Sequence, residues 1–346
     1  MAGAIPIQNI YYLLCYAWDQ LAEADEIDVA SDECHSLDEL FARVLSNGTQ
    51  QLIKRGLDRD YRLHREETAS LKGRFDLSAS MAKQTWRQGR MVCEFDELSH
   101  DILHNRILKT TISLLAANPH LRTQSLALIH HQEKLLGQIP PIRITSRLFR
   151  NVRLHRNNRQ YRFLMNVCEL IHDSLLPTEE KGDSRFRDFI REKKTMASLF
   201  EKFIRNFYAQ HSSFAVSAPH LHWCTEGTPE SLALVPRMET DVVLYSSEQQ
   251  IVLDCKFYKD AFKAKGEARA RFNSNHLYQI TAYLRNARRE KEWPKVEGIL
   301  LYPAVGHDFY HDLQLDGSRL QIASINLDQD WQNIHRRLLS LLAPSD

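Results

Sequence analysis

Three common functional signatures are missing from this chain of 346 residues. No two cysteines have the Cys-x-x-Cys spacing, which argues against a zinc ribbon or an iron–sulfur cluster, and six scattered cysteines are typical of reduced thiols in a cytosol. No Gly-x-x-x-x-Gly-Lys-Ser/Thr loop is present, so we expect no nucleotide site of the phosphate-loop type in this chain. No apolar run approaches the roughly 20 residues of a membrane span, and the first residues lack the pattern of a secretory signal. We therefore expect a cytoplasmic protein.

An excess of charge is also missing. The formal net charge is +1, so any contact with nucleic acid must come from local clusters of basic residues. The length suits two domains, and 43% hydrophobic residues are enough for sizeable cores. Residues 177–184 (PTEEKGDS) have the composition of a linker. We therefore expect one domain over residues 1–185 and a second over residues 186–346, both of mixed α+β or α/β class.

Residues 236–259 carry the strongest chemical signal. Two β-rich stretches, 238–245 and 251–258, flank a polar turn and predict a hairpin. Side chains alternate along a strand, so Asp254 and Lys256 share one face, and the hairpin brings Asp241 close to Asp254. Two carboxylates on adjacent strands repel unless a cation joins them, and Mg²⁺ prefers such oxygen ligands. The pattern indicates metal-assisted phosphodiester hydrolysis, with Lys256 orienting water or stabilising phosphate charge. The alternative is an ordinary ion pair on a solvent-facing hairpin.

Two flanking helices add candidate site residues. In a predicted helix over residues 275–286, Gln279 and Tyr283 are four apart and lie side by side. In a predicted helix that begins near residue 196, Glu201 is a candidate third metal ligand or a surface charge paired with Arg205. Residues 298–305 and 322–326 predict further strands, the second at a sheet edge, and residues 331–342 predict a closing helix.

The order of these elements resembles the PD-(D/E)xK nuclease superfamily, a mixed sheet flanked by helices. Asp241 stands for the first acid, although Thr240 replaces the usual proline, and Asp254-Cys255-Lys256 stands for the (D/E)xK part. The Gln-x-x-x-Tyr helix is similar to that of the RecB-like branch, and this resemblance implies that Gln279 and Tyr283 line the site.

The first half of the chain predicts helices and short strands with two basic features. Lys72 and Arg74 flank a glycine at a predicted turn and are candidates for contact with a phosphate or a partner. Residues 134–168 contain no acidic residue, and seven arginines between 143 and 162 predict an exposed arginine-rich arm. Its candidates for contact with a partner or a phosphate are Arg147, Arg150, Arg153 and Arg156. A solvated charged loop is the alternative. An aromatic-rich helix over residues 10–21 is either buried on most sides or a docking surface.

Seven short stretches, spread over nearly the full length, carry a more specific resemblance: residues 5–12 (IPIQNIYY), 16–18 (YAW), 72–74 (KGR), 95–98 (FDEL), 105–109 (NRILK), 237–241 (RMETD) and 254–258 (DCKFY). On these stretches the chain resembles the McrC family, the nuclease subunits of the McrBC systems that restrict 5-methylcytosine DNA. The resemblance implies a Mg²⁺-dependent endonuclease for phage defence that docks through its N-terminal region to a hexameric McrB-like AAA+ GTPase ring. The partner binds the GTP, this chain stimulates its hydrolysis, and the substrate is double-stranded DNA with modified cytosine. A stand-alone repair nuclease and a regulatory adaptor with a vestigial site remain alternatives.

Overall fold

The computed structural model describes residues 5–19, 36–155, 158–175, 193–256, 262–263, 271–290 and 295–343, and they form two compact units. One unit is Ser36–Ser184, and the other combines Met1–His35 with Arg185–Asp346. The boundary near residue 185 agrees with the linker-like sequence. The expected assignment of residues 1–35 to the N-terminal domain is wrong, because they belong to the unit formed by the second half of the chain.

The unit of residues 36–184 contains a small group of packed helices. Its helices are α3 (Leu37–Arg55), α5 (Leu103–Ala116), α6 (Thr123–Leu135), α7 (Ser146–Arg150) and α8 (Arg159–Leu175). Ser36 caps the first of them by accepting a hydrogen bond from the backbone N–H of Glu39, and Gly56 ends it. The apolar faces of these helices meet around fully buried Leu40, Ile107 and Leu164.

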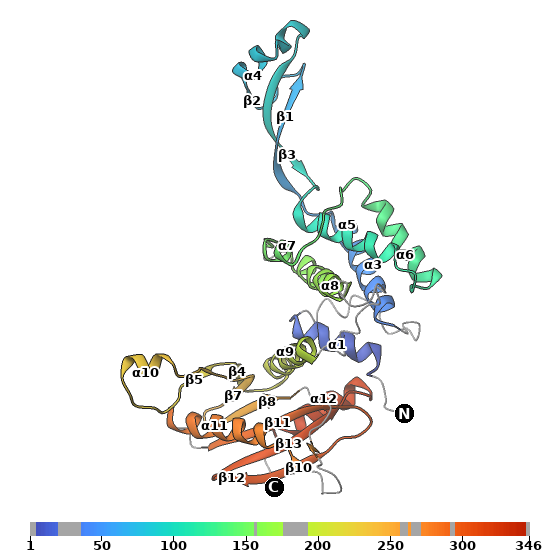
Figure 1. Ribbon diagram of the computed structural model, residues 1–346. Coiled ribbons are helices and arrows are strands. Elements are labelled where there is room, and N and C mark those ends of the chain that lie inside the picture. The colour runs from blue at the N-terminus through green and yellow to red at the C-terminus, as the bar shows by residue number, and fades with distance from the viewer. Residues whose placement is uncertain are drawn as a thin grey trace. The chain divides into compact units, whose positions relative to one another are not determined.

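A small antiparallel sheet of three strands in the same unit forms a ribbon with a capped end. Its long strands are β1 (Asp60–Thr68) and β3 (Met91–Ser99), and between them in the sequence come β2 (Arg74–Phe75), which pairs with β3, α4 (Leu77–Ala82) and the 3₁₀ helix η1 (Thr85–Gln88). Figure 1 shows this β-ribbon (residues 60–99) reaching beyond the helices of its own unit. Gly73 turns the chain there at φ +57°, where a Cβ atom would lie 2.4 Å from the Glu94 carbonyl oxygen.

The other unit is built on a six-stranded mixed sheet in the order β12-β13-β11-β8-β7-β4. The strands are β4 (Ala215–Ser217), β7 (Val242–Tyr245), β8 (Gln249–Cys255), β11 (Lys295–Ala304), β12 (Tyr310–Leu315) and β13 (Ser318–Asn326). The central strand β11 runs parallel to β8 and β13, and the remaining pairs are antiparallel. Two short pairs complete the strands: β5 (His220–Leu221) with β6 (Met238–Glu239), and β9 (Phe262–Lys263) with β10 (Arg271–Phe272).

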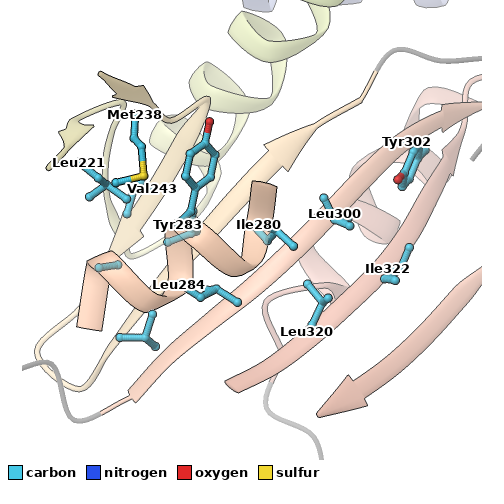
Figure 2. Packing of buried hydrophobic residues seen from close by; sticks show 13 residues of the cluster. Leu221, Met238, Val243, Ile280, Tyr283, Leu284, Leu300, Tyr302, Leu320 and Ile322 are labelled. Atoms are coloured by element: carbon cyan, nitrogen blue, oxygen red, sulfur yellow. The ribbon is translucent and has the colours of Figure 1, made fainter. Parts of the chain in front are cut away.

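Helices cover this sheet on both sides. They are α9 (Lys193–His211), α11 (Ser274–Glu290) and α12 (Trp331–Ser340), with the short α10 (Pro229–Ala233) in the connection between β5 and β6. Helix α11 packs its apolar face on the centre of the sheet, where Ile280 and Leu284 meet Leu300 and Leu320 (Figure 2). Gly298 permits this close approach, because a Cβ atom there would lie 3.0 Å from the Leu284 and Leu320 side chains. The covered central strands explain why β8 is apolar on both faces.

The N-terminal helix α1 (Ile7–Ala17) belongs to the core of this second unit. It packs along α9, and the Asn9 amide donates to the carbonyl oxygens of Leu327 at 2.9 Å and Gln329 at 2.8 Å. Tyr12 stacks on Trp331 with ring centroids 4.8 Å apart, and Tyr16 lies edge-on to Phe203. The aromatic face of this helix is therefore buried within its own chain. Of the two alternatives, the helix is part of the core and is not a docking surface.

Two further expectations for the strands need correction. The predicted strand over residues 238–245 is divided between β6 and β7, which belong to different sheets, and its predicted partner ends as β8 at Cys255 in the described chain. Residues 322–326 belong to β13, which is internal because β12 forms the edge of the sheet. Among the residues described, no helix is both long and apolar enough to cross a membrane.

Candidate active site

The predicted Asp254–Lys256 pair lies at the carboxyl end of β8, beneath α11. Asp254 is fully buried, and its Oδ2 atom lies 2.6 Å from Lys256 Nζ. The ammonium group of Lys256 also donates to Gln279 Oε1 at 3.0 Å. The strand therefore fixes the two charges side by side, and the helix above it holds the lysine from a second direction.

Gln279 and Tyr283 extend this contact along α11. The Gln279 amide nitrogen donates to the Tyr283 hydroxyl at 2.8 Å, and that hydroxyl donates to the Glu239 carbonyl at 2.8 Å. A continuous chain of hydrogen bonds thus runs from Lys256 to the end of β6. The structure brings together the polar residues that the hairpin and the Gln-x-x-x-Tyr helix predicted, while their catalytic roles stay a prediction.

Asp241 lies in the break between β6 and β7. Val242 pairs with Leu253, so the register of the hairpin continues with Asp241 opposite Asp254. The Cys255 backbone N–H donates to Asp241 Oδ2 at 2.7 Å, which fixes this carboxylate against the end of β8. The two acids therefore share one end of the hairpin, as the sequence predicted.

One residue at the site was missed by sequence reasoning. Arg205 on α9 donates through Nε and Nη2 to the Asp241 carbonyl at 3.1 and 2.8 Å, and so ties the first helix of this unit to the first acid. Arg205 stands one helical turn after Glu201, and this spacing predicts only a surface ion pair between the two side chains. Its real target is a backbone oxygen, and sequence carries no signal for such a contact.

Burial and mutual repulsion perturb the acids of this site. Burial raises the pKa of Asp254, and the charge of Asp241 adds to the rise while Lys256 opposes it. Burial likewise raises the pKa of Asp241, against the hydrogen bond from Cys255. Burial and the nearby Asp241 raise the pKa of Glu201 on α9 to about 7. Burial alone would lower the pKa of Lys256, but the charges of Asp254 and Asp241 outweigh it and raise that pKa. The site therefore has more negative charge than one ammonium group can neutralise.

The donor set fits a hard cation such as Mg²⁺. Asp254 Oδ1 is buried without a hydrogen-bond partner in the described chain, so one carboxylate oxygen is left for an ion. Across the described ranges, no three His, Cys, Asp or Glu side chains are gathered closely enough to form a complete metal cage. Mg²⁺ does not require one, because it is commonly held by one or two carboxylates and keeps several waters. Asp241 and Asp254 are thus the first candidates as ligands, with Glu201 as a third.

The candidates for partner contact lie in the other unit, on residues 36–184. Lys72 and Arg74 are exposed at the turn before and within β2, and the Lys72 ammonium lies 5.0 Å from the Phe95 ring centre. Arg147 and Arg150 lie on α7, Arg153 follows it, and Arg156 lies outside the described residues. The arginine-rich segment is thus partly helical, along α7 and the start of α8, and is not a loop throughout. Arg147, Arg150 and Arg153 are exposed and form no ion pair with the described part of the chain.

Comparisons with known proteins agree along most of the chain. The family model for a McrBC 5-methylcytosine restriction system component matches residues 7–303. The chain is 32% identical over 339 residues to the type IV methyl-directed restriction enzyme EcoKMcrBC of Escherichia coli strain K12, covering 97% of each sequence. A solved half-complex from a tetradecameric assembly of Thermococcus gammatolerans McrB AAA+ hexamers with bound McrC matches 98% of this chain and 76% of its own. Its TM-score is 0.57 at 19% identity, so this likeness concerns the fold alone.

Proposed function

Because this chain belongs to the family of McrBC 5-methylcytosine restriction system components, we propose that it is the DNA-cleaving subunit of such a system. The reaction is hydrolysis of a phosphodiester bond in double-stranded DNA that carries modified cytosine. The observation that carries the proposal is the convergence of Asp241, Asp254 and Lys256 at one end of a buried hairpin, with Gln279 holding the lysine. This arrangement supports the site that the resemblance to the PD-(D/E)xK superfamily implies.

In this mechanism Asp254 and Asp241 would hold Mg²⁺, and Glu201 is a further candidate ligand. The bound ion would activate a water molecule and polarise a phosphoryl oxygen. Lys256 is kept charged by its acidic neighbours and is aimed by Gln279. It donates to the attacking water or to a non-bridging oxygen as negative charge builds on the phosphate. The water oxygen bonds to phosphorus, one phosphorus–oxygen ester bond breaks, and the leaving oxygen takes a proton.

We also propose that the unit of residues 36–184 binds a McrB-like AAA+ GTPase ring and stimulates its GTP hydrolysis. The relatives are named for assemblies of this kind. The end of the β-ribbon supports this proposal, because a cluster of exposed large apolar side chains is typical of a site that binds another protein. The exposed side chains there are Leu71, Phe75, Leu77, Met81 and Trp86. Lys72 and Arg74 lie among them, and Arg147, Arg150 and Arg153 offer a second basic surface for a partner or for phosphates.

The test reconstitutes this chain with its GTPase partner, GTP, Mg²⁺ and DNA with or without methylated cytosine. We expect Lys256→Ala to abolish cleavage, a loss of at least about a hundredfold, while GTP turnover and assembly with the partner stay at the wild-type level. Cleavage by the purified chain without GTP or partner would favour a stand-alone nuclease. Undiminished restriction by both Lys256→Ala and Asp254→Ala would show that the chain acts as an adaptor.

A further inference from the structure

Three polar residues on one face of α11 each bind a different strand. His276, Gln279 and Tyr283 are spaced by three and four residues, so they share a face of the helix. Tyr283 donates to the carbonyl of Glu239 on β6, and Gln279 accepts from Lys256 at the end of β8. His276 reaches β11, where its Nδ1 atom lies 2.8 Å from the Tyr302 hydroxyl. The mechanism proposed above uses the contacts of Gln279 and Tyr283, whereas the hydrogen bond between His276 and Tyr302 is not part of it.

The hydrogen bonds around His276 indicate its tautomer. Asn273 Oδ1 accepts from the Asn275 backbone N–H at 3.2 Å, which turns the amide nitrogen of Asn273 toward His276 Nε2, also at 3.2 Å. That nitrogen can only donate, so Nε2 accepts and the proton of a neutral imidazole resides on Nδ1. His276 therefore donates to the Tyr302 oxygen. The Tyr302 hydroxyl acts as the acceptor in this hydrogen bond, and its own proton does not point at His276.

Tyr302 lies beside the catalytic lysine. Leu301 pairs with Cys255 in the parallel register, and the Lys256 backbone N–H donates to the Leu301 carbonyl, so Tyr302 and Lys256 are neighbours on the face that α11 covers. Figure 2 shows the Tyr302 ring on this face of the sheet. Both His276 and Tyr302 are buried. Burial and the charge of Asp254 raise the pKa of Tyr302, so its hydroxyl stays protonated.

We propose that His276 and Tyr302 are positioning residues of the DNA-cleavage reaction, which rests on the nuclease function proposed above. Their hydrogen bond fixes the first turn of α11 to β11, one turn before Gln279. Gln279 is the group that holds Lys256, so a shift of this turn moves the ammonium away from the scissile phosphate.

The sharpest variant is Tyr302→Phe, which removes one oxygen atom and keeps the ring. Tyr208→Phe is its matched control, because that buried hydroxyl donates to the Leu338 carbonyl at 2.9 Å within the same unit and has no contact with Lys256 or α11 among the hydrogen bonds described. Single-turnover cleavage is measured in the reconstituted complex at saturating DNA and Mg²⁺. We expect the Tyr302→Phe cleavage rate to fall about tenfold or more, with unchanged DNA affinity and GTP turnover. Tyr208→Phe cleaves like the wild type, although both variants lose thermal stability.

His276 is tested by rescue. Asparagine places an amide N–H near the position of Nδ1 and can still donate to Tyr302, whereas alanine cannot. We expect His276→Asn to cleave severalfold faster than His276→Ala. Equal cleavage rates for Tyr302→Phe and Tyr208→Phe, or for the two folded His276 variants, would overturn the positioning role. Lys256→Ala in parallel separates the two proposals, because wild-type cleavage by that variant contradicts the nuclease assignment itself.

Discussion

Glu201 offers a test of the site that needs neither DNA nor a partner. Its pKa rises from an ordinary 4.5 to about 7 in the fold, chiefly because it is partly buried and then because Asp241 lies near. A rise of about 2.5 in pKa corresponds to an upper limit of about 3 kcal/mol between the two protonation states. The folded protein therefore pays this free energy when Glu201 ionises.

The sign of the effect follows from which state binds the proton more tightly. The folded state does, so the stabilising effect of the proton is fully present below pH 4.5 and is lost as the pH rises to about 7. The Glu201→Gln side chain cannot ionise, so the variant does not lose this stability as the pH rises. Relative to the wild type, we expect the variant to gain about 1–3 kcal/mol in free energy of unfolding between pH 5 and pH 8, without divalent cations.

The measurement is urea unfolding of both proteins across this pH range, with Glu230→Gln as a control at an exposed glutamate. A Glu201→Gln difference that does not change with pH would refute the reasoning, since it would mean that Glu201 ionises as easily in the fold as in the unfolded chain. Adding Mg²⁺ tests the ligand role separately. If Glu201 binds the ion, Mg²⁺ stabilises the wild type more than the variant.

Three further predictions concern other parts of the molecule. The rate of DNA cleavage should fall about tenfold per pH unit below pH 7, because protons and metal compete for Asp254 and Glu201. A higher Mg²⁺ concentration should therefore move this fall in rate to lower pH. A rate that stays constant down to pH 5.5 would contradict the raised pKa values of these acids. Asn9→Ala should destabilise the unit that contains α1 by about 1–3 kcal/mol in urea unfolding, because two backbone carbonyls lose their donor. Gly73→Ala should impair stimulation of the partner's GTPase while leaving Mg²⁺ binding intact, because its Cβ atom meets the Glu94 carbonyl; full stimulation by this variant would exclude a role for the β-ribbon.

Local periodicity predicted the elements that carry the candidate site. The alternation along β8 placed Asp254 and Lys256 together, and the helical spacing of α11 placed Gln279 beside Tyr283. These patterns are short in range, because each depends only on residues within one strand or one helix. Their mutual contact depends on the hairpin register, which two apolar strands joined by a short polar turn specify well.

Contacts between distant segments could not be predicted in this way. The strand over residues 238–245 breaks because the Thr240 backbone N–H and hydroxyl both bond to the Pro219 carbonyl, some twenty residues earlier. The edge strand β12 went unrecognised because its side chains are mostly exposed and so lack an apolar face. The aromatic helix α1 fits a core and a docking surface equally well in sequence, and only its packing on α9 and Trp331 decides between them.

The packing of α1 on α9 also bears on the position of the candidate acids. Residues 36–184 are inserted between α1 and α9, and these two helices pack together, with the Asn206 amide donating to the Tyr16 carbonyl at 2.8 Å. The last helix described before the inserted unit and the first helix described after it therefore lie side by side. Helix α9 also carries Glu201 and Arg205, and Arg205 holds the backbone of Asp241. Because α1 packs on α9, and Arg205 on α9 holds the backbone of Asp241, the packing of α1 contributes to the position of the first candidate acid.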